Sequence, residues 1–193
     1  MIRLPRRSLF SALLVLPVAC AELATPRGPL APPAGLLGDA PDPGRAAITA
    51  LDEAFRNGGA GLREPAALAR AAAVLEWLAA DLQTNPRWAP VPSNLRDRVV
   101  AAREEMRVAL GLMTGIPSPD AARALADASA ALDRGDRRAA VNALGGGRFR
   151  HGGERTLERL GNPGPLPVGE IAMGLLAQEV ARLDRTNGWV VQP

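Results

Sequence analysis

The residues with the clearest chemical potential lie in a glycine-rich segment, 145–155. It holds five glycines, three arginines and the only histidine of the chain. Backbone amides, guanidinium groups and an imidazole can converge there on a phosphate or a carboxylate. Arg148, Arg150 and His151 are therefore the candidate ligand-binding residues, for an anionic ligand. The segment lacks the P-loop pattern. The alternative is a loop between helices whose Phe149 fills the core and whose arginines are solvated.

Catalysis by this segment would need a partner for His151. A histidine that acts as a general base needs an orienting carboxylate, and Glu154 is the nearest candidate in the sequence. No serine stands in a Gly-x-Ser-x-Gly motif, and no other nucleophile has a recognisable setting. We therefore predict no catalytic residue. Since the chain has one Cys and one His, we also predict no metal site and no cofactor.

Three glutamates outside this segment, Glu53, Glu104 and Glu105, could suggest carboxylate chemistry. Each follows a polar face of a predicted helix, and Arg103 and Arg107 stand beside the last two. This alternation of charges predicts a solvated, ion-paired surface rather than an acid–base pair.

The first residues have the layout of an export signal, 1–19. Arg3, Arg6 and Arg7 precede an apolar run, 9–19, which is shorter than the ~20 residues that span a bilayer and ends in small residues. The stretch from Arg6 to Phe10, Arg-Arg-Ser-Leu-Phe, resembles the twin-arginine export signal with its Phe and Leu inverted. The alternative is that these arginines are ordinary charges of a general secretory signal.

The end of the apolar run, 16–20, reads Leu-Pro-Val-Ala-Cys and resembles a bacterial lipobox. In that family the Cys is diacylated and becomes the first residue of the mature protein. The pattern differs at Pro17, where Leu is usual. The resemblance implies a lipid anchor at Cys20, and Ala21, in place of the Asp that marks inner-membrane retention, implies the outer membrane. The alternative is ordinary cleavage after Ala21, which would leave a soluble periplasmic protein.

The charge of the exported chain is balanced. All 23 basic residues are Arg, three of them precede Cys20, and all 20 acidic residues follow it. The mature chain therefore has 20 Arg against 20 Asp and Glu, a formal charge of zero. Binding to a phosphate backbone requires a basic surface, so we predict no nucleic-acid partner.

A proline- and glycine-rich segment, 20–43, follows the signal. Six prolines favour extended backbone, which predicts a semi-rigid tether between Cys20 and a folded domain, 44–193. The alternative is a tail that wraps on the domain through three of its leucines, Leu30, Leu36 and Leu37.

Apolar residues then recur at helical spacing between capping residues and helix breakers. The predicted helical segments are 42–56, 65–85, 93–114, 118–133, 136–144, 156–160 and 168–184, of which the fifth and sixth are short. The inward faces include Ala109 and Met113 of the third segment and Ile171 and Leu175 of the last. Aromatic residues make up only 3% of the chain and no βαβ alternation occurs. We predict an all-α bundle of five to six helices with Ala-rich interfaces.

The mature part loosely resembles small helical exported proteins of unknown function from GC-rich Gram-negative bacteria. Together with the signal, this favours a non-enzymatic, envelope-tethered helical module with a structural role or an unknown envelope protein as its partner. The alternative is a periplasmic binding protein or enzyme that uses the glycine-rich segment on an anionic ligand. A ligand site should bring Arg148, Arg150 and His151 together in a hollow, whereas an interaction module should expose an apolar patch.

Overall fold

The computed structural model describes residues 30–189, and the regular elements of this part of the chain are helical. The elements are α1 (Pro43–Gly59), η1 (Ala60–Leu62), α2 (Pro65–Thr84), η2 (Pro86–Trp88), α3 (Ser93–Leu110), α4 (Ser118–Asp133), α5 (Arg137–Ala143), α6 (Gly152–Gly161) and α7 (Pro167–Arg185), where η denotes a short 3₁₀ helix. The predicted all-α bundle is confirmed. The predicted count of five to six is too low, because both short segments form separate α-helices and make seven. Helix α6 also begins four residues before its predicted start.

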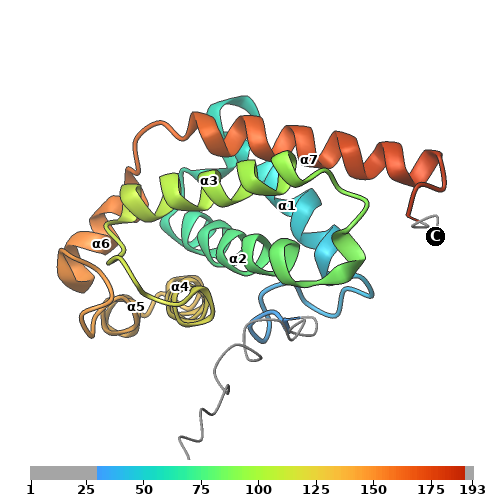
Figure 1. Cartoon of the computed structure of the whole chain (residues 1–193). Helices are drawn as coiled ribbons and strands as arrows, with labels where there is room; N and C mark the ends of the chain where they lie inside the picture. The colour runs from blue at the N-terminus through green and yellow to red at the C-terminus, as the bar shows by residue number, and fades with distance from the viewer. Residues whose placement is uncertain (1–29, 190–193) are drawn as a thin grey trace, which may run out of the picture.

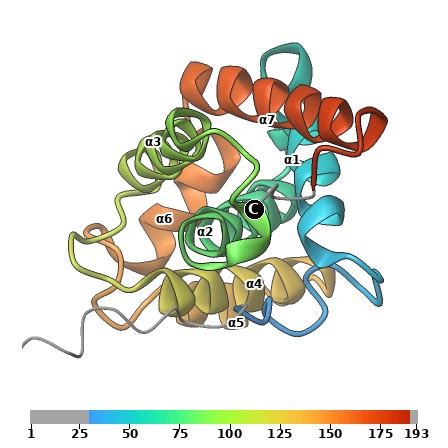
Figure 2. The same cartoon turned by 45° about the vertical axis from the view of Figure 1, so that its right-hand side comes forward.

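Helix α2 forms the centre of the bundle. Helix α4 lies on one side of it and α3 and α7 on the other, while α1 and α6 lie along its flanks (Figure 1, Figure 2). Thirteen of its twenty residues are buried, a pattern that predicts a helix enclosed by others. Helices α2 and α4 are in extensive contact and both bury several alanines, and such small side chains let two helix axes approach closely. The interfaces of the bundle are therefore Ala-rich, as the composition predicted.

The two outer helices α1 and α7 pack tightly against each other. The Asp42 carboxylate accepts the backbone N–H of Arg45 at 3.0 Å, and Pro43 occupies the first turn of α1, two features that favour helix initiation. Phe55 lies near the end of α1, against α7 at Gly169. A Cβ atom at that glycine would lie 2.3 Å from the Phe55 ring, so only glycine permits this approach.

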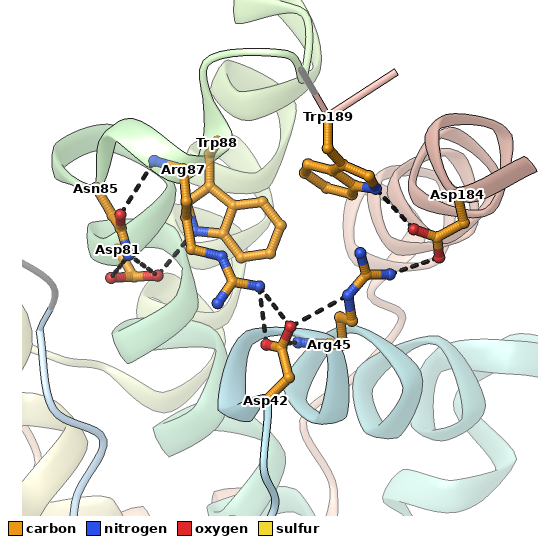
Figure 3. A network of polar contacts seen from close by, with 8 residues as sticks. All are labelled: Asp42, Arg45, Asp81, Asn85, Arg87, Trp88, Asp184 and Trp189. Atoms are coloured by element: carbon orange, nitrogen blue, oxygen red, sulfur yellow. Dashed lines mark hydrogen bonds and ion pairs between the residues drawn. The ribbon is translucent and has the colours of Figure 1, made fainter. Parts of the chain in front are cut away.

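A polar network joins the ends of several elements, and Figure 3 shows it. The Asp42 carboxylate accepts hydrogen bonds from the guanidinium groups of Arg45 and Arg87, and the Arg45 guanidinium also donates to the Asp184 carboxylate at 2.5 Å. Trp189, just after α7, donates to Asp184 at 2.6 Å. Its ring meets that of the buried Trp88 edge-on, with the centroids 5.9 Å apart. The network therefore holds the start of α1, η2 and the end of α7 together.

The N-terminal segment before α1 packs on the helices from Leu30 onward. The Leu30 backbone N–H donates to the buried Asp81 carboxylate at 3.3 Å, and its carbonyl accepts the Trp77 indole N–H at 2.8 Å. The three leucines of the wrapping alternative all contact the core: Leu30, Leu36 and Leu37. Residues 30–42 therefore wrap on the domain. The rest of the predicted tether, the export signal and Cys20 lie outside the described residues. No helix in 30–189 is both long enough and apolar enough to span a membrane.

Candidate functional site

The glycine-rich segment is fastened to the end of α3. Phe149 forms an isolated antiparallel bridge with Leu112, and its side chain is buried. The Met113 N–H donates to the Arg148 carbonyl, and the Arg150 N–H donates to the Gly111 carbonyl, both at 2.8 Å. Phe149 thus fills the core as the alternative proposed. The same bridge holds the neighbouring arginine and histidine beside the last turn of α3.

The three candidate ligand-binding residues are not all brought together. Arg150 and His151 line an open hollow of about 620 Å³ between the end of α3, the following loop and α6. Arg148 is not among the residues that line it, and its guanidinium donates to the Gly145 carbonyl of its own turn at 3.4 Å. This hydrogen bond turns the Arg148 side chain toward the start of its own loop and away from the hollow. The structure therefore supports two members of the predicted cluster as neighbours in one hollow.

His151 is the residue that precedes α6, and its side chain contacts Gly111, whose backbone φ is +72°. A Cβ at Gly111 would lie 2.9 Å from the imidazole, so glycine both adopts this conformation and leaves room for the ring. Glu154, the predicted orienting carboxylate, accepts Arg137 at 2.6 Å instead. No His–Glu acid–base pair is therefore formed at this site.

Arg159 also lines the hollow, and sequence analysis missed it. One guanidinium nitrogen donates to the Ala109 carbonyl at 2.9 Å, at the end of α3, where helix carbonyls lack partners. The signal was present in the spacing, because Arg155 and Arg159 lie four residues apart on α6 and His151 precedes Arg155 by another four. Of these three residues, His151 and Arg159 line the hollow.

A buried ion pair borders the hollow and was also missed. Arg107 donates to both carboxylate oxygens of Glu76, at 2.6 and 2.7 Å, and to the Ser118 hydroxyl at 3.2 Å. Burial lowers the pKa of the Arg107 guanidinium, but the hydrogen bonds and charge of Glu76 outweigh burial, and the pKa is raised above its usual value. Glu76 lies among the apolar residues of α2, and the apolar periodicity of this helix gave no indication that Glu76 pairs with an arginine of another helix.

The three glutamates that the sequence analysis considered have surroundings that differ from those of Glu76. Glu104 pairs with Arg103 on the surface, as predicted. Glu105 instead accepts the backbone N–H groups of Val168 and Gly169, at 3.1 and 2.9 Å, at the start of α7. A carboxylate at this end of a helix satisfies free N–H groups and complements the helix dipole. Glu105 therefore joins α3 to α7. The third glutamate, Glu53, is exposed on α1.

An apolar stripe is exposed along α7. Val168, Ile171 and Leu175 are 39%, 56% and 40% exposed and follow one another at helical spacing along one side of α7, and Leu175 also lines a groove between α7 and α3. The prediction that Ile171 and Leu175 point inward is wrong, because the buried face passes through Gly169, Ala172, Met173, Leu176, Val180 and Leu183 instead.

The prediction that Met113 points inward from the third helical segment is likewise wrong. Helix α3 ends at Leu110, which takes the buried position, and Met113 is 40% exposed. Ala109 is only half-buried.

Comparison with known proteins adds no relative. The chain matches no protein-family model, no curated protein and no solved structure. Within residues 30–189, no group of three or more His, Cys, Asp or Glu side chains is placed to hold a metal ion.

Proposed function

We propose that this protein is a non-enzymatic helical module of the bacterial envelope, exported and anchored by lipid at Cys20. In this proposal its role is to bind another envelope protein through the apolar stripe of α7, Val168, Ile171 and Leu175. The stripe is the observation that carries the proposal. The described residues hold five exposed large hydrophobic side chains, and these three share one edge of one helix.

Clustering is what distinguishes this stripe from ordinary surface. Single exposed apolar residues are common, whereas a group on one face favours a contact with a partner. The three residues follow one another at i, i+3 and i+7, the spacing of an apolar helix face. Beyond Leu175 the stripe continues into a shallow groove of about 690 Å³ between α3 and α7, which Leu95, Arg98 and Arg182 also line. An apolar centre beside a charged rim is typical of protein interfaces.

A comparative pull-down tests the stripe. The full chain with a C-terminal tag is expressed in its native cells and pulled down from their solubilised envelope, and the proteins captured with it are identified by mass spectrometry. The test variant is Ile171→Arg, and the matched control is Ala50→Arg, which places the same charge at an exposed position of α1. We expect a partner captured by the wild type and the control but lost from Ile171→Arg at unchanged melting temperature. Identical captures by all three proteins would contradict the role of the stripe.

Lipid anchoring has a separate test. If Cys20 is acylated, the mature protein partitions into detergent, and Cys20→Ala is released or left unprocessed. An intact mass that begins at Glu22 would instead identify ordinary signal cleavage and refute the anchor. This result would leave the proposal for the α7 stripe standing.

A further inference from the structure

We propose that the hollow between α3 and α6 binds a phosphate group that is carried by a ligand with an apolar part. Three cationic or hydrogen-bonding side chains supply the phosphate site: Arg150, His151 and Arg159. This assignment is independent of the proposed partner of α7. It also replaces Arg148 of the predicted cluster by Arg159.

The charge balance of the hollow favours an anion. Its lining includes Arg107, Arg150, Arg159 and one carboxylate, that of Glu104. Arg107 is neutralised by the buried Glu76, and Glu104 is neutralised by Arg103. Among the described residues, no carboxylate forms an ion pair with the remaining two arginines, Arg150 and Arg159. Two unneutralised guanidinium groups match the charge of about −1.5 to −2 of a phosphomonoester.

Two side chains of the hollow, those of His151 and Arg159, are also held in place. Arg159 is fixed through one nitrogen by the Ala109 carbonyl, and its other guanidinium N–H groups have no protein acceptor among residues 30–189. The imidazole of His151 packs on Gly111, and the backbone of Arg150 is hydrogen-bonded to the same glycine. A guanidinium group that is positioned beforehand, as that of Arg159 is, binds phosphate oxygens through paired, charge-assisted hydrogen bonds.

Apolar side chains beside these cations indicate the second part of the ligand. Val108 is 78% exposed and Met113 is 40% exposed, and both line the hollow together with Leu112. Exposed hydrophobic side chains next to free cations fit an amphiphilic phosphate better than a small inorganic ion. Two sources share this chemistry, a soluble phosphomonoester with an apolar group and the headgroup of an anionic lipid.

Calorimetric titration of the full chain tests the site. The probes are inorganic phosphate and dihexanoyl phosphatidic acid below its micelle concentration. We expect saturable binding, tighter for the phosphatidic acid. Arg150→Gln and Arg159→Gln should each weaken it about tenfold, since hydrogen bonds to charged groups are worth about that factor. The control Arg134→Gln removes an exposed arginine at the end of α4, which does not line the hollow, and should bind as the wild type does.

Sedimentation with phosphatidylcholine vesicles, with and without phosphatidic acid, identifies the source. Binding to the anionic vesicles that Arg150→Gln weakens supports a lipid headgroup, whereas binding of the short-chain probe alone supports a soluble ligand. Arg150 is exposed and its side chain forms no hydrogen bond within residues 30–189, so this variant stays informative even if Arg159→Gln unfolds. The proposal is overturned if no probe binds saturably, or if the Arg150→Gln and Arg134→Gln variants behave alike. Equal affinity for the two soluble probes would overturn the roles of Val108 and Met113.

Discussion

The buried Glu76–Arg107 pair makes a sharp prediction, because its two members lie on two helices that pack against each other, α2 and α3. The Glu76 side chain is 3% exposed and that of Arg107 is 13% exposed. At a charge separation of about 4 Å and an effective dielectric constant of about 20, the attraction is about 4 kcal/mol. Desolvation of both groups offsets much of this attraction, so the pair as a whole contributes little net stability.

Removing one member alone is different, because the other charge stays buried without a partner. Glu76→Met should therefore lower the free energy of unfolding by about 3–5 kcal/mol. The double variant Glu76→Met/Arg107→Met should recover most of this loss, since well-packed apolar residues often replace a buried pair without net cost. The matched control is Glu104→Met, which breaks the exposed pair with Arg103 and should cost about 0.2–1 kcal/mol.

Urea unfolding followed by far-ultraviolet circular dichroism measures these differences, and tryptophan fluorescence tests whether the transition is two-state. The reasoning is refuted if Glu76→Met costs no more than Glu104→Met. It is refuted equally if the double variant loses the sum of its two single variants, because the pair would then not act as a unit.

Three further predictions concern packing and pH. Gly169→Ala should destabilise, since its Cβ would meet the Phe55 ring, whereas Gly174→Ala in the same helix has room and should gain about 0.5–1 kcal/mol in urea unfolding; equal effects would contradict this packing. Leu75→Ala should cost about 2–5 kcal/mol in the same assay, because Leu75 is fully buried in α2, and a negligible loss would mean that it is not core. Burial raises the pKa of the Asp42 carboxyl, but hydrogen bonds and charge from the neighbouring arginines outweigh it and lower the pKa below its usual value. Asp42→Asn should thus be less stable than the wild type at neutral pH, and this difference should shrink as pH falls from about 5 through the folded-state pKa; thermal melts over pH should show it, and a constant difference would contradict it.

Much of the local structure was predictable because it depends on neighbours in the chain. Helix starts at Pro65 and Ser118 follow from proline and capping residues, which act within one turn. The regular helical backbone of α1 likewise breaks after Phe55, since Asn57 and Gly58 adopt positive φ values. The start of α6 was misplaced by four residues because glycines disfavour helix locally. Gly152, the first residue of α6, has a backbone φ of +72°, and a Cβ at Gly153 would lie 2.1 Å from the Val141 carbonyl oxygen, so both positions require glycine. The close approach of α6 to Val141 is a tertiary contact that local preference does not reveal.

The candidate site divides in the same way. The sequence by itself determined that an arginine- and histidine-bearing loop with Phe149 at its centre joins two helices, because glycine content and spacing are local properties. Only the tertiary structure decided that Arg150 and His151 share a hollow with Arg159 while Arg148 turns away, since three separate segments meet there. It also decided that Ile171 is exposed. Apolar periodicity gives the faces of a helix, but the neighbours that pack against it determine which apolar side chains are covered.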